Sequence, residues 1–362
     1  MSRDTLPRVY IIAEAGVNHN GNIDLALKMI DAAVGAGVDG VKFQTFNVEQ
    51  LVAATAAKAS YQKMAGQADE TQGEMLAKLA ISESDHQRLK THCQEQNIEF
   101  LSTPFDCGSL DFLIKQLGLE KIKLSSGAIT HGPLLLAAGQ SGANIILSTG
   151  LSNLGEVEQA LMILAYGLSN SSLPPSLKGF SQAYATPESQ QALQDKVTLL
   201  HCTTQYPAPM KDINLRAMDI LHKAFALDVG FSDHSLGISA PLAAVARGAR
   251  VIEKHFTMDK TMTGPDHKAS LNVDELKEMV KGIREVELAL GVAKKFSTNS
   301  ENENRSVVRS SLTALTDIAK GAVFTDENLG VKRPGMGISP VNYWSWLGCR
   351  ARRDFVKDEA IE

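Results

Sequence analysis

The sequence predicts a (β/α)8 barrel of the TIM type followed by a small, mainly β domain. Eight short apolar segments recur along the chain, and each ends in polar residues and leads toward a helical pattern. Most of them start about 20 to 30 residues apart, which is the length that one strand–helix unit needs. Eight such units in succession favour a closed parallel barrel, and the structural alternative is a doubly wound open sheet.

The predicted strands are rich in aliphatic and β-branched residues, as buried parallel strands are. Ser82 and Asp85 suit the start of a helix, and Gly37, Gly118 and Gly291 suit helix ends. The strands lie at 9–16, 40–46, 99–106, 121–127, 144–150, 197–207, 227–235 and 251–259. Helical periodicity appears at 22–36, 82–97, 154–164, 214–225 and 273–290, and the longest gaps, 49–80 and 167–196, are interpreted as insertions.

The pattern of strands and helices changes after Gly291. We expect a catalytic barrel at 1–291, a polar linker at 292–305 and a small domain at 306–362. A domain of this size has little core of its own, so we expect it to pack on a barrel.

Composition excludes several classes of protein. The 36 Lys and Arg residues against 41 Asp and Glu give a net charge of -5, so a general nucleic-acid binder is excluded. No apolar run approaches the roughly 18 residues of a membrane span, and the N-terminal residues do not resemble a signal peptide. The four cysteines have no CxxC spacing, which argues against a zinc knuckle or a redox pair. We therefore expect reduced thiols and a cytoplasmic location.

Polar side chains gather at the C-terminal ends of the predicted strands, which form the active-site mouth of a β/α barrel. Lysines inside apolar strands need anionic partners. We expect Lys42 and Lys123 to bind a ligand that carries a phosphate and a carboxylate, with structural ion pairs as the alternative. The strand-end side chains are Glu14, Lys42, Gln44, Thr103, Lys123, Ser126, Ser148, Thr204, Tyr206, Ser232, His234, Glu253 and His255.

Two histidines end neighbouring predicted strands. His234 and His255 can converge on one ion, and two imidazoles suit Mn, Zn or Fe in a partly open site. The alternative is that one of them is a core histidine. Glu14 is interpreted as a metal ligand, a base or the partner of a barrel lysine.

Three loops carry further candidates. His19 follows the first strand, and it either serves the site or makes a loop hydrogen bond. Asp266, in the Gly-Pro loop after the eighth strand, is expected to reach the mouth and bind hydroxyl groups. By composition alone, the KRPG turn at 332–335 is a plain surface turn.

Nine strings occur in an order that resembles the sialic acid synthase family. They are EAGVNHNG, VKFQTF, LSTPFD, KLSSG, ILSTG, HCTTQYP, FSDHS, EKHF and GPDHKAS. The tail KGAVFTDENLGVKRPGMGISP resembles that family's C-terminal antifreeze-like (SAF) domain. The resemblance extends over residues 9–361, nearly the whole chain.

The resemblance implies condensation of phosphoenolpyruvate with an open-chain 2-acetamido-hexose of the N-acetylmannosamine type and water. The products are a nine-carbon sialic acid, N-acetylneuraminate, and phosphate. The metal would be Mn²⁺, with Mg²⁺ or Co²⁺ as alternatives, held by His234 and His255. Arg333 would reach a partner subunit's barrel in a domain-swapped homodimer and touch the acyl group of the sugar, which replaces the plain-turn interpretation.

The resemblance also assigns roles inside the barrel. Glu14, Lys42, Lys123 and Asp266 are the expected catalytic residues. Gln44, Tyr206 and Asp266 would contact the sugar. The expected phosphoenolpyruvate contacts are Lys42, Thr103, Lys123, Ser126, Ser148, Thr204 and Ser232.

One position departs from the family pattern. Ala128 stands where the family usually has a sugar-contacting Glu, and one lost hydrogen bond of roughly 1–3 kcal/mol can alter substrate choice. The same reaction on a 2,4-diacetamido-trideoxyhexose, which gives legionaminate, is therefore an alternative. More distant alternatives are a metal-dependent pyruvate aldolase and an inactive sugar-binding homologue.

Overall fold

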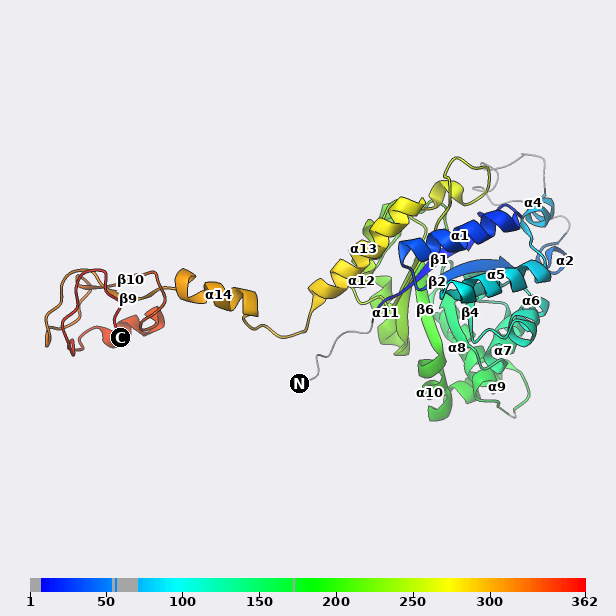
Figure 1. Cartoon of the computed structure of the whole chain (residues 1–362). Coiled ribbons are helices and arrows are strands. Elements are labelled where there is room, and N and C mark those ends of the chain that lie inside the picture. The colour runs from blue at the N-terminus through cyan, green and yellow to red at the C-terminus, as the bar shows by residue number, and fades with distance from the viewer. Residues whose placement is uncertain (1–7, 54–55, 57–70, 172) are drawn as a thin grey trace. The chain divides into compact units, whose positions relative to one another are not determined.

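The computed structural model describes residues 8–53, 56, 71–171 and 173–362. The chain divides into two compact units, Met1–Gly291 and Val292–Glu362 (Figure 1). Part of the first insertion predicted from the sequence, namely 54–55 and 57–70, lies outside the described residues. Within the described ranges, no helix combines the length and apolar character that crossing a membrane would need.

Eight parallel strands form the centre of the first unit, in the order β3-β2-β1-β8-β7-β6-β5-β4. Consecutive strands are neighbours, β1 also pairs with β8, and β3 lies in contact with β4. This arrangement confirms the predicted barrel, because a doubly wound sheet would reverse its strand order at β1. The strands are β1 (Tyr10–Gly16), β2 (Gly40–Thr45), β3 (Glu99–Pro104), β4 (Lys121–Leu124), β5 (Asn144–Ser148), β6 (Val197–Cys202), β7 (Asp228–Asp233) and β8 (Val251–His255).

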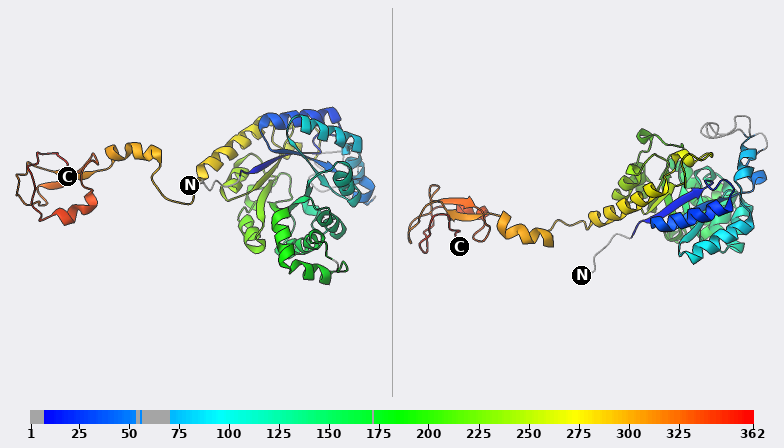
Figure 2. Two further views of the ribbon diagram at one scale, coloured as in Figure 1. Left: turned by 60° about the horizontal axis from the view of Figure 1, so that its bottom comes forward. Right: turned by 45° about the horizontal axis from the view of Figure 1, so that its top comes forward.

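Helices surround these strands (Figure 2). All five predicted helices are present: α1 (Ile23–Ala36), α5 (Glu83–Glu95), α8 (Leu154–Leu168), α11 (Ala217–Phe225) and α13 (Val273–Leu290). Those not predicted are α2 (Val48–Leu51), α4 (Gln72–Leu79), α6 (Cys107–Asp111), α7 (Gly132–Gln140), α9 (Leu177–Tyr184), α10 (Pro187–Lys196) and α12 (Ser239–Ala246). The sequences of α7 and α12 are almost wholly apolar, so they lack the polar face that reveals a helix by periodicity.

Helix α1 shows how local sequence sets the element boundaries. The Asn22 side chain accepts a hydrogen bond from the Leu25 backbone N–H and caps the first turn. Gly37 ends the helix with φ 77°, a conformation that glycine adopts without strain. Between these ends, α1 buries a face that includes Met29 and Ile30.

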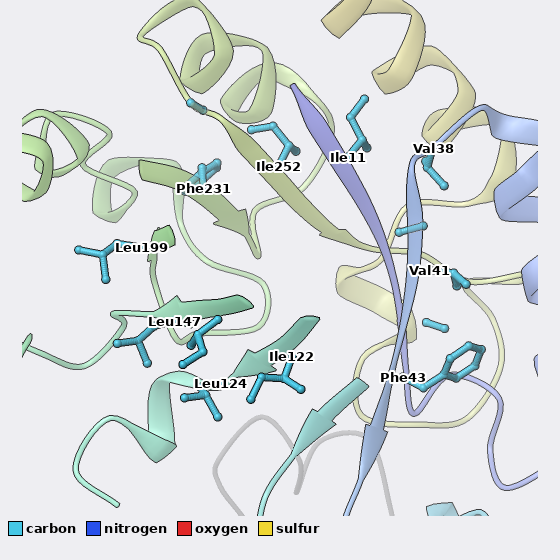
Figure 3. Close-up of a cluster of buried hydrophobic side chains, with 14 of the residues drawn as sticks. Ile11, Val38, Val41, Phe43, Ile122, Leu124, Leu147, Leu199, Phe231 and Ile252 are labelled. Carbon is cyan, nitrogen blue, oxygen red and sulfur yellow. The ribbon is translucent and has the colours of Figure 1, made fainter. Parts of the chain in front are cut away.

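The barrel has an apolar layer on each side of its strands. Outward-facing residues pack between the strands and the helices, as Phe231 and Ile252 do (Figure 3). A second apolar cluster contains one residue from each of five strands, namely Ile12, Leu101, Ile146, Leu200 and Val251. On four of these five strands, the residue two positions after the cluster member is polar. Because side chains alternate along a strand, these polar residues lie on the same face of the barrel as the cluster and closer to the C-terminal ends of the strands.

The second unit is small and has its own core. Strands β9 (Ser311–Ala314) and β10 (Leu329–Lys332) pair antiparallel, and the aromatic segment forms α15 (Tyr343–Trp346). Part of the expected polar linker is helical, because Thr298 and Glu301 form a capping box at the start of α14 (Asn299–Val308). The core consists of Leu312, Ala314, Ile318, Phe324, Leu329, Ala351, Phe355 and Ile361.

Candidate active site

A cavity of about 430 Å³ opens at the C-terminal ends of the barrel strands. Every site residue predicted within the barrel lines it, from β1 round to the loop after β8. Arg333 follows β10 and belongs to the second unit. The predicted residues that line the cavity are Glu14, Lys42, Gln44, Thr103, Lys123, Ser126, Ser148, Thr204, Tyr206, Ser232, His234, His255 and Asp266.

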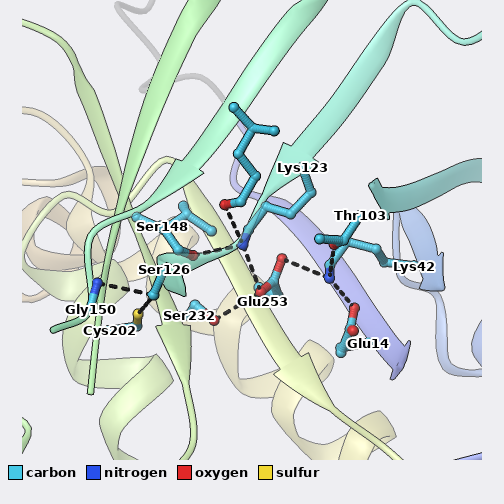
Figure 4. A network of polar contacts seen from close by, with 12 residues as sticks. Glu14, Lys42, Thr103, Lys123, Ser126, Ser148, Gly150, Cys202, Ser232 and Glu253 are labelled. Carbon is cyan, nitrogen blue, oxygen red and sulfur yellow. Dashed lines mark hydrogen bonds and ion pairs between the residues drawn. The ribbon is translucent and has the colours of Figure 1, made fainter. Parts of the chain in front are cut away.

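Two lysines and two glutamates form one buried charge cluster in the cavity (Figure 4). The Lys42 Nζ lies 2.5 Å from Glu14 Oε2 and 3.7 Å from Glu253 Oε2. The Lys123 Nζ lies 3.6 Å from Glu253 Oε1, so Glu253 bridges the two ammonium groups. The ion pairs considered as the alternative for these lysines therefore exist, and the same lysines line the cavity.

Hydroxyl groups surround this charge cluster. Lys42 donates a hydrogen bond to Thr103 Oγ1 at 3.0 Å, and Lys123 donates to Ser148 Oγ at 2.7 Å. Ser232 donates to Glu253 Oε1 at 2.8 Å. The three hydroxyls and the two ammonium groups form a concave set of donors suited to an anion with several oxygen atoms.

Burial and mutual attraction set the protonation of the cluster. Burial raises the pKa of Glu14 to about 7 against the attraction of Lys42, and the Glu253 carboxylate adds to the rise. Burial also acts against the charge of Glu253, but Lys123 and Lys42 outweigh it and lower the pKa to about 2. Burial lowers the pKa of Lys123. Burial also disfavours the charged form of Lys42, but the carboxylates of Glu14 and Glu253 outweigh it and raise the pKa of Lys42. Within this cluster, Glu14 is thus the group that exchanges a proton near neutral pH.

Glu253 is a site residue to which the sequence analysis assigned no role. It stands two positions before His255 on β8, so both side chains point into the barrel. Sequence analysis named it only as a strand-end side chain, and this period-two spacing from a predicted metal ligand is the signal that could have given it a role.

Ser126 is held at the edge of the cavity by two neighbours. Its Oγ accepts a hydrogen bond from the Gly150 backbone N–H at 3.1 Å and lies 3.0 Å from Cys202 Sγ. A Cβ atom at Gly150 would lie 2.3 Å from Thr204 Oγ1 and 2.7 Å from Ser126 Oγ. The loop after β5 can therefore approach these hydroxyls only because residue 150 has no side chain.

The two histidines face each other across a short gap, with ring centroids 5.6 Å apart. The His234 Nδ1 donates to the Thr203 carbonyl at 2.7 Å, which leaves the Nε2 lone pair free. The His255 Nδ1 is buried without a hydrogen-bond partner. Burial lowers the pKa of His234 to about 4 and that of His255 well below its usual value, so both rings are neutral.

This arrangement fits a divalent metal. Neutral imidazoles with free lone pairs are good ligands, and a partnerless buried nitrogen is otherwise unfavourable. Among the residues whose positions are described, no group of three or more His, Cys, Asp and Glu side chains could hold an ion. A metal at His234 and His255 would therefore take its remaining ligands from water or substrate, as open catalytic sites do.

The loop after β8 brings Asp266 to the cavity, with its Oδ2 3.9 Å from His255 Nδ1. Burial raises the pKa of Asp266 to about 6, and Lys42 opposes the rise. His19 makes a loop contact instead: its Nδ1 accepts a hydrogen bond from the Gly21 backbone N–H at 3.1 Å. The interpretation of His19 as a loop residue is therefore the one that the contacts support.

One side of the cavity is apolar. We call the cluster of Val17, Phe46, Met75, Leu76 and Leu79 the apolar wall. Three of its members come from one face of α4, which begins with a capping box between Thr71 and Glu74. The sequence analysis missed this wall because α4 lies in a segment interpreted as an insertion.

The position that departs from the family pattern does not line the cavity. Ala128 is 6 % exposed and belongs to the main hydrophobic core. The cavity lining that this turn provides consists of Ser125, Ser126 and Gly127.

Comparisons with known protein families, sequences and structures all match this chain to one family of synthases. The NeuB family matches residues 29–295, and the SAF domain matches residues 309–362. The chain is 46% identical to the N,N'-diacetyllegionaminic acid synthase of Campylobacter jejuni, over 98% of this chain and 99% of that protein. It is 44% identical to the enzyme of the same name from Legionella pneumophila, over 94% and 90% of the two chains. The solved structure of an N-acetylneuraminic acid synthetase from Leptospira borgpetersenii, in complex with citrate, is 34% identical with a TM-score of 0.67, over 82% of this chain and 90% of that one.

Proposed function

The chain belongs to the NeuB family and is an enzyme of the transferase type, and we propose that it joins phosphoenolpyruvate to an open-chain acetamido-hexose. The observation that carries the proposal is the juxtaposition, in one cavity, of the Lys42–Lys123 cluster and the His234–His255 pair. The first suits a small polyanion, and the second suits an ion that binds an aldehyde oxygen. Water is consumed, and a nine-carbon 2-keto acid and phosphate are formed.

Phosphoenolpyruvate occupies the charge cluster. Lys42 and Lys123 neutralise its phosphate and carboxylate, with hydroxyl contacts from Thr103, Ser148 and Ser232. Ser126 and Thr204 complete this half of the site. These groups hold carbon 3 of phosphoenolpyruvate toward the acceptor, so their main contribution is positioning and charge neutralisation.

His234 and His255 hold the metal, which we take to be Mn²⁺, with Mg²⁺ and Co²⁺ as alternatives. When bound, such an ion supplies Lewis-acid polarisation of the aldehyde oxygen. Gln44, Tyr206 and Asp266 orient the sugar, and Asp266 lies 3.9 Å from His255 in the same cavity, close to where the aldehyde would bind.

Glu14 handles the proton of the water. As carbon 3 bonds to the aldehyde carbon, carbon 2 becomes positively charged, and the buried carboxylates of Glu14 and Glu253 stabilise that charge. Glu14 then orients the water that adds at carbon 2 and accepts its proton, for which a pKa of about 7 is well suited. The proton held by Glu14 then passes to the former aldehyde oxygen, which becomes a hydroxyl group. The tetrahedral carbon finally breaks its C–O bond to phosphate, which leaves with the electron pair and takes up the proton of the carbon 2 hydroxyl, so that carbon 2 becomes a ketone.

The acceptor that the site favours is a 2,4-diacetamido-2,4,6-trideoxyhexose, which makes the product a legionaminate. This sugar carries a methyl group and a second acetyl group where N-acetylmannosamine carries hydroxyls. The apolar wall suits these groups, whereas a hydroxyl placed there loses its hydrogen bonds to water. The names of the relatives that are 46% and 44% identical support the same choice.

A phosphate-release assay on the full chain tests the proposal. Phosphoenolpyruvate is offered with the diacetamido sugar, with N-acetylmannosamine or with no sugar. We expect kcat/KM to be about tenfold or more higher for the diacetamido sugar. A preference for N-acetylmannosamine would refute the choice of acceptor. In a parallel reaction that contains pyruvate in place of phosphoenolpyruvate, formation of the 2-keto acid would indicate an aldolase. Binding of sugar without any turnover would indicate an inactive homologue.

The proposal includes a cytoplasmic, domain-swapped homodimer in which Arg333 completes the partner's site. Arg333 is exposed, and exposed apolar side chains accompany it in the same unit, among them Met336 and Trp344 at 77 % each. At the barrel mouth, Leu151 in the loop after β5 is also 77 % exposed. The proposed exchange would cover these side chains against the partner subunit.

A further inference from the structure

One ion pair outside the cavity lies in an unusual place. The Lys254 Nζ lies 2.5 Å from Asp233 Oδ2, and both side chains are fully buried. On β7 and β8 these residues share the outward face with Phe231 and Ile252, which pack in the apolar layer between strands and helices (Figure 3). The pair therefore does not belong to the charge cluster of the cavity.

The register of the sheet links this pair to the two histidines. Asp233 and Lys254 are direct partners in the parallel pairing of β7 with β8. Asp233 immediately precedes His234, and Lys254 immediately precedes His255. Because neighbouring side chains along a strand point to opposite faces, the ion pair lies on the outer side of the two strand ends whose imidazoles face the cavity.

Further hydrogen bonds tie the end of β7 to the same pair. The Ser235 backbone N–H donates to Asp233 Oδ1 at 2.8 Å, and the Ser235 carbonyl accepts a hydrogen bond from Lys254 Nζ. His234 lies between these two residues and outside the ladder of β7, which ends at Asp233. Lys254 therefore holds the side chain of Asp233 and the backbone of Ser235, the two residues that flank His234. The His234 carbonyl itself accepts a backbone hydrogen bond from Ala208, so the ion pair adds to that contact from the outer side of the barrel.

Stability alone does not account for such a pair. Removing two charges from water into an apolar layer is unfavourable, and well-packed apolar residues in their place are often as stable or more stable. The attested advantage of a buried polar pair is that it specifies register and position.

We propose that Asp233 and Lys254 are positioning residues that set the separation of His234 and His255 for a shared metal ion. The inference rests on the metal site of the proposed function. The ion pair joins the two strand ends behind the imidazoles, so that their 5.6 Å separation is fixed before the ion arrives. Preorganisation of this kind lowers the ordering that metal binding would otherwise require.

The test is Mn²⁺ affinity, measured on metal-stripped full-length protein by the electron paramagnetic resonance signal of free Mn²⁺. Lys254→Met leaves a buried unpaired carboxylate and should lower both thermal stability and affinity. The double variant Asp233→Asn/Lys254→Met removes both charges, so it should recover most of the stability. The Kd of the double variant for Mn²⁺ should still be about tenfold or more higher than that of the wild type. This is the lower end of the loss expected when a group that holds a metal ligand in place is removed.

Two further variants serve as controls for this test. Arg284→Met breaks another ion pair of the barrel, 2.9 Å from Asp39, and should lower stability without changing Mn²⁺ affinity. His255→Ala should abolish binding. Wild-type affinity in the folded double variant, with binding lost in His255→Ala, would overturn the positioning role alone. Unchanged affinity in His255→Ala would overturn the metal site and this inference with it.

A charge-conserving variant extends the test to the case in which the double variant does not fold. Lys254→Arg keeps the positive charge but has a longer, planar head group, so it should shift the end of β7 and weaken Mn²⁺ binding while the protein stays folded. Wild-type affinity in this variant would likewise overturn the positioning role.

Discussion

Glu14 derives its chemistry from its surroundings rather than from its type. It is buried, it lies 2.5 Å from the Lys42 ammonium, and the bridging carboxylate of Glu253 is close by. Because burial raises its pKa to about 7 against the attraction of Lys42, and Glu253 adds to the rise, Glu14 changes charge in the range in which the enzyme is expected to work.

Glu14→Gln should therefore lower kcat by about 10²- to 10⁴-fold, the usual contribution of a general acid or base. The amide keeps the shape of the side chain, so binding of phosphoenolpyruvate should change much less than turnover. Phosphate release at saturating substrate, together with isothermal titration of phosphoenolpyruvate binding, separates the two effects. Full turnover in this variant would show that Glu14 moves no proton.

His19 makes stability depend on pH. Burial lowers its pKa to about 4 from 6.5. The unfolded chain therefore binds a proton below about pH 6.5 that the folded protein does not bind until about pH 4. The contribution of His19 is fully present above pH 6.5 and is lost as the pH falls toward 4, by about 3 kcal/mol in all.

The variant His19→Asn tests this expectation, because its amide oxygen can still accept the hydrogen bond from the Gly21 N–H. Urea unfolding of the metal-free protein between pH 4 and 7 measures the slope. The variant should lose about 3 kcal/mol less than the wild type over that range. Parallel curves for the two proteins would contradict a buried neutral His19.

At the level of single residues, the sequence predicted which side chains reach the cavity best where they end a strand. Lys42, Lys123, His234 and His255 all reach the cavity because a parallel barrel collects its strand ends at one mouth. The contacts of Glu253 were beyond sequence analysis, because they depend on distances between strands that only the folded barrel fixes.

Among the elements of the structure, α4 determines one side of the cavity. Met75, Leu76 and Leu79 lie on the same face of this short helix, and all three line the cavity. They supply the apolar contacts that should distinguish a methyl group from a hydroxyl.

Leu76→Gln should therefore lower kcat/KM for the diacetamido-trideoxyhexose by about tenfold and affect N-acetylmannosamine less, because one apolar contact in a pocket contributes about 1–3 kcal/mol of discrimination. Steady-state phosphate release with each sugar measures the ratio. Leu288→Gln on α13, where the leucine is 84 % exposed, is the matched control and should change neither value. An equal loss for both sugars would mean that the wall does not select the acceptor.

The predicted helices have two distinct faces, but α4 and α9, which also do, were missed because they lie in the segments interpreted as insertions. The predicted range 22–36 became α1, with its cap at Asn22 and its glycine stop at Gly37. The apolar helices α7 and α12 carry no periodic signal, because both of their faces are buried or small. Capping boxes mark α4 and α14, but a cap alone does not distinguish a short helix from a loop.

For the whole molecule, the two units have separate cores and divide after Gly291. The cavity is formed within the barrel, whereas Arg333 lies in the other unit. The resemblance to a known family, and not the contacts within this chain, is what connects Arg333 to the reaction. A test of that connection must therefore separate the contributions of two subunits.

Mixing two inactive variants achieves this separation. Arg333→Ala supplies an intact barrel without the arginine, and Lys123→Met supplies the arginine with a disabled barrel. If Arg333 works across subunits, unfolding and refolding the two together at equal amounts forms half of the dimers as hybrids, each with one complete site. About a quarter of the wild-type phosphate release should then return, by random pairing. If Arg333 instead served its own barrel, each hybrid would contain one chain with a dead barrel and one without the arginine, and no activity would return.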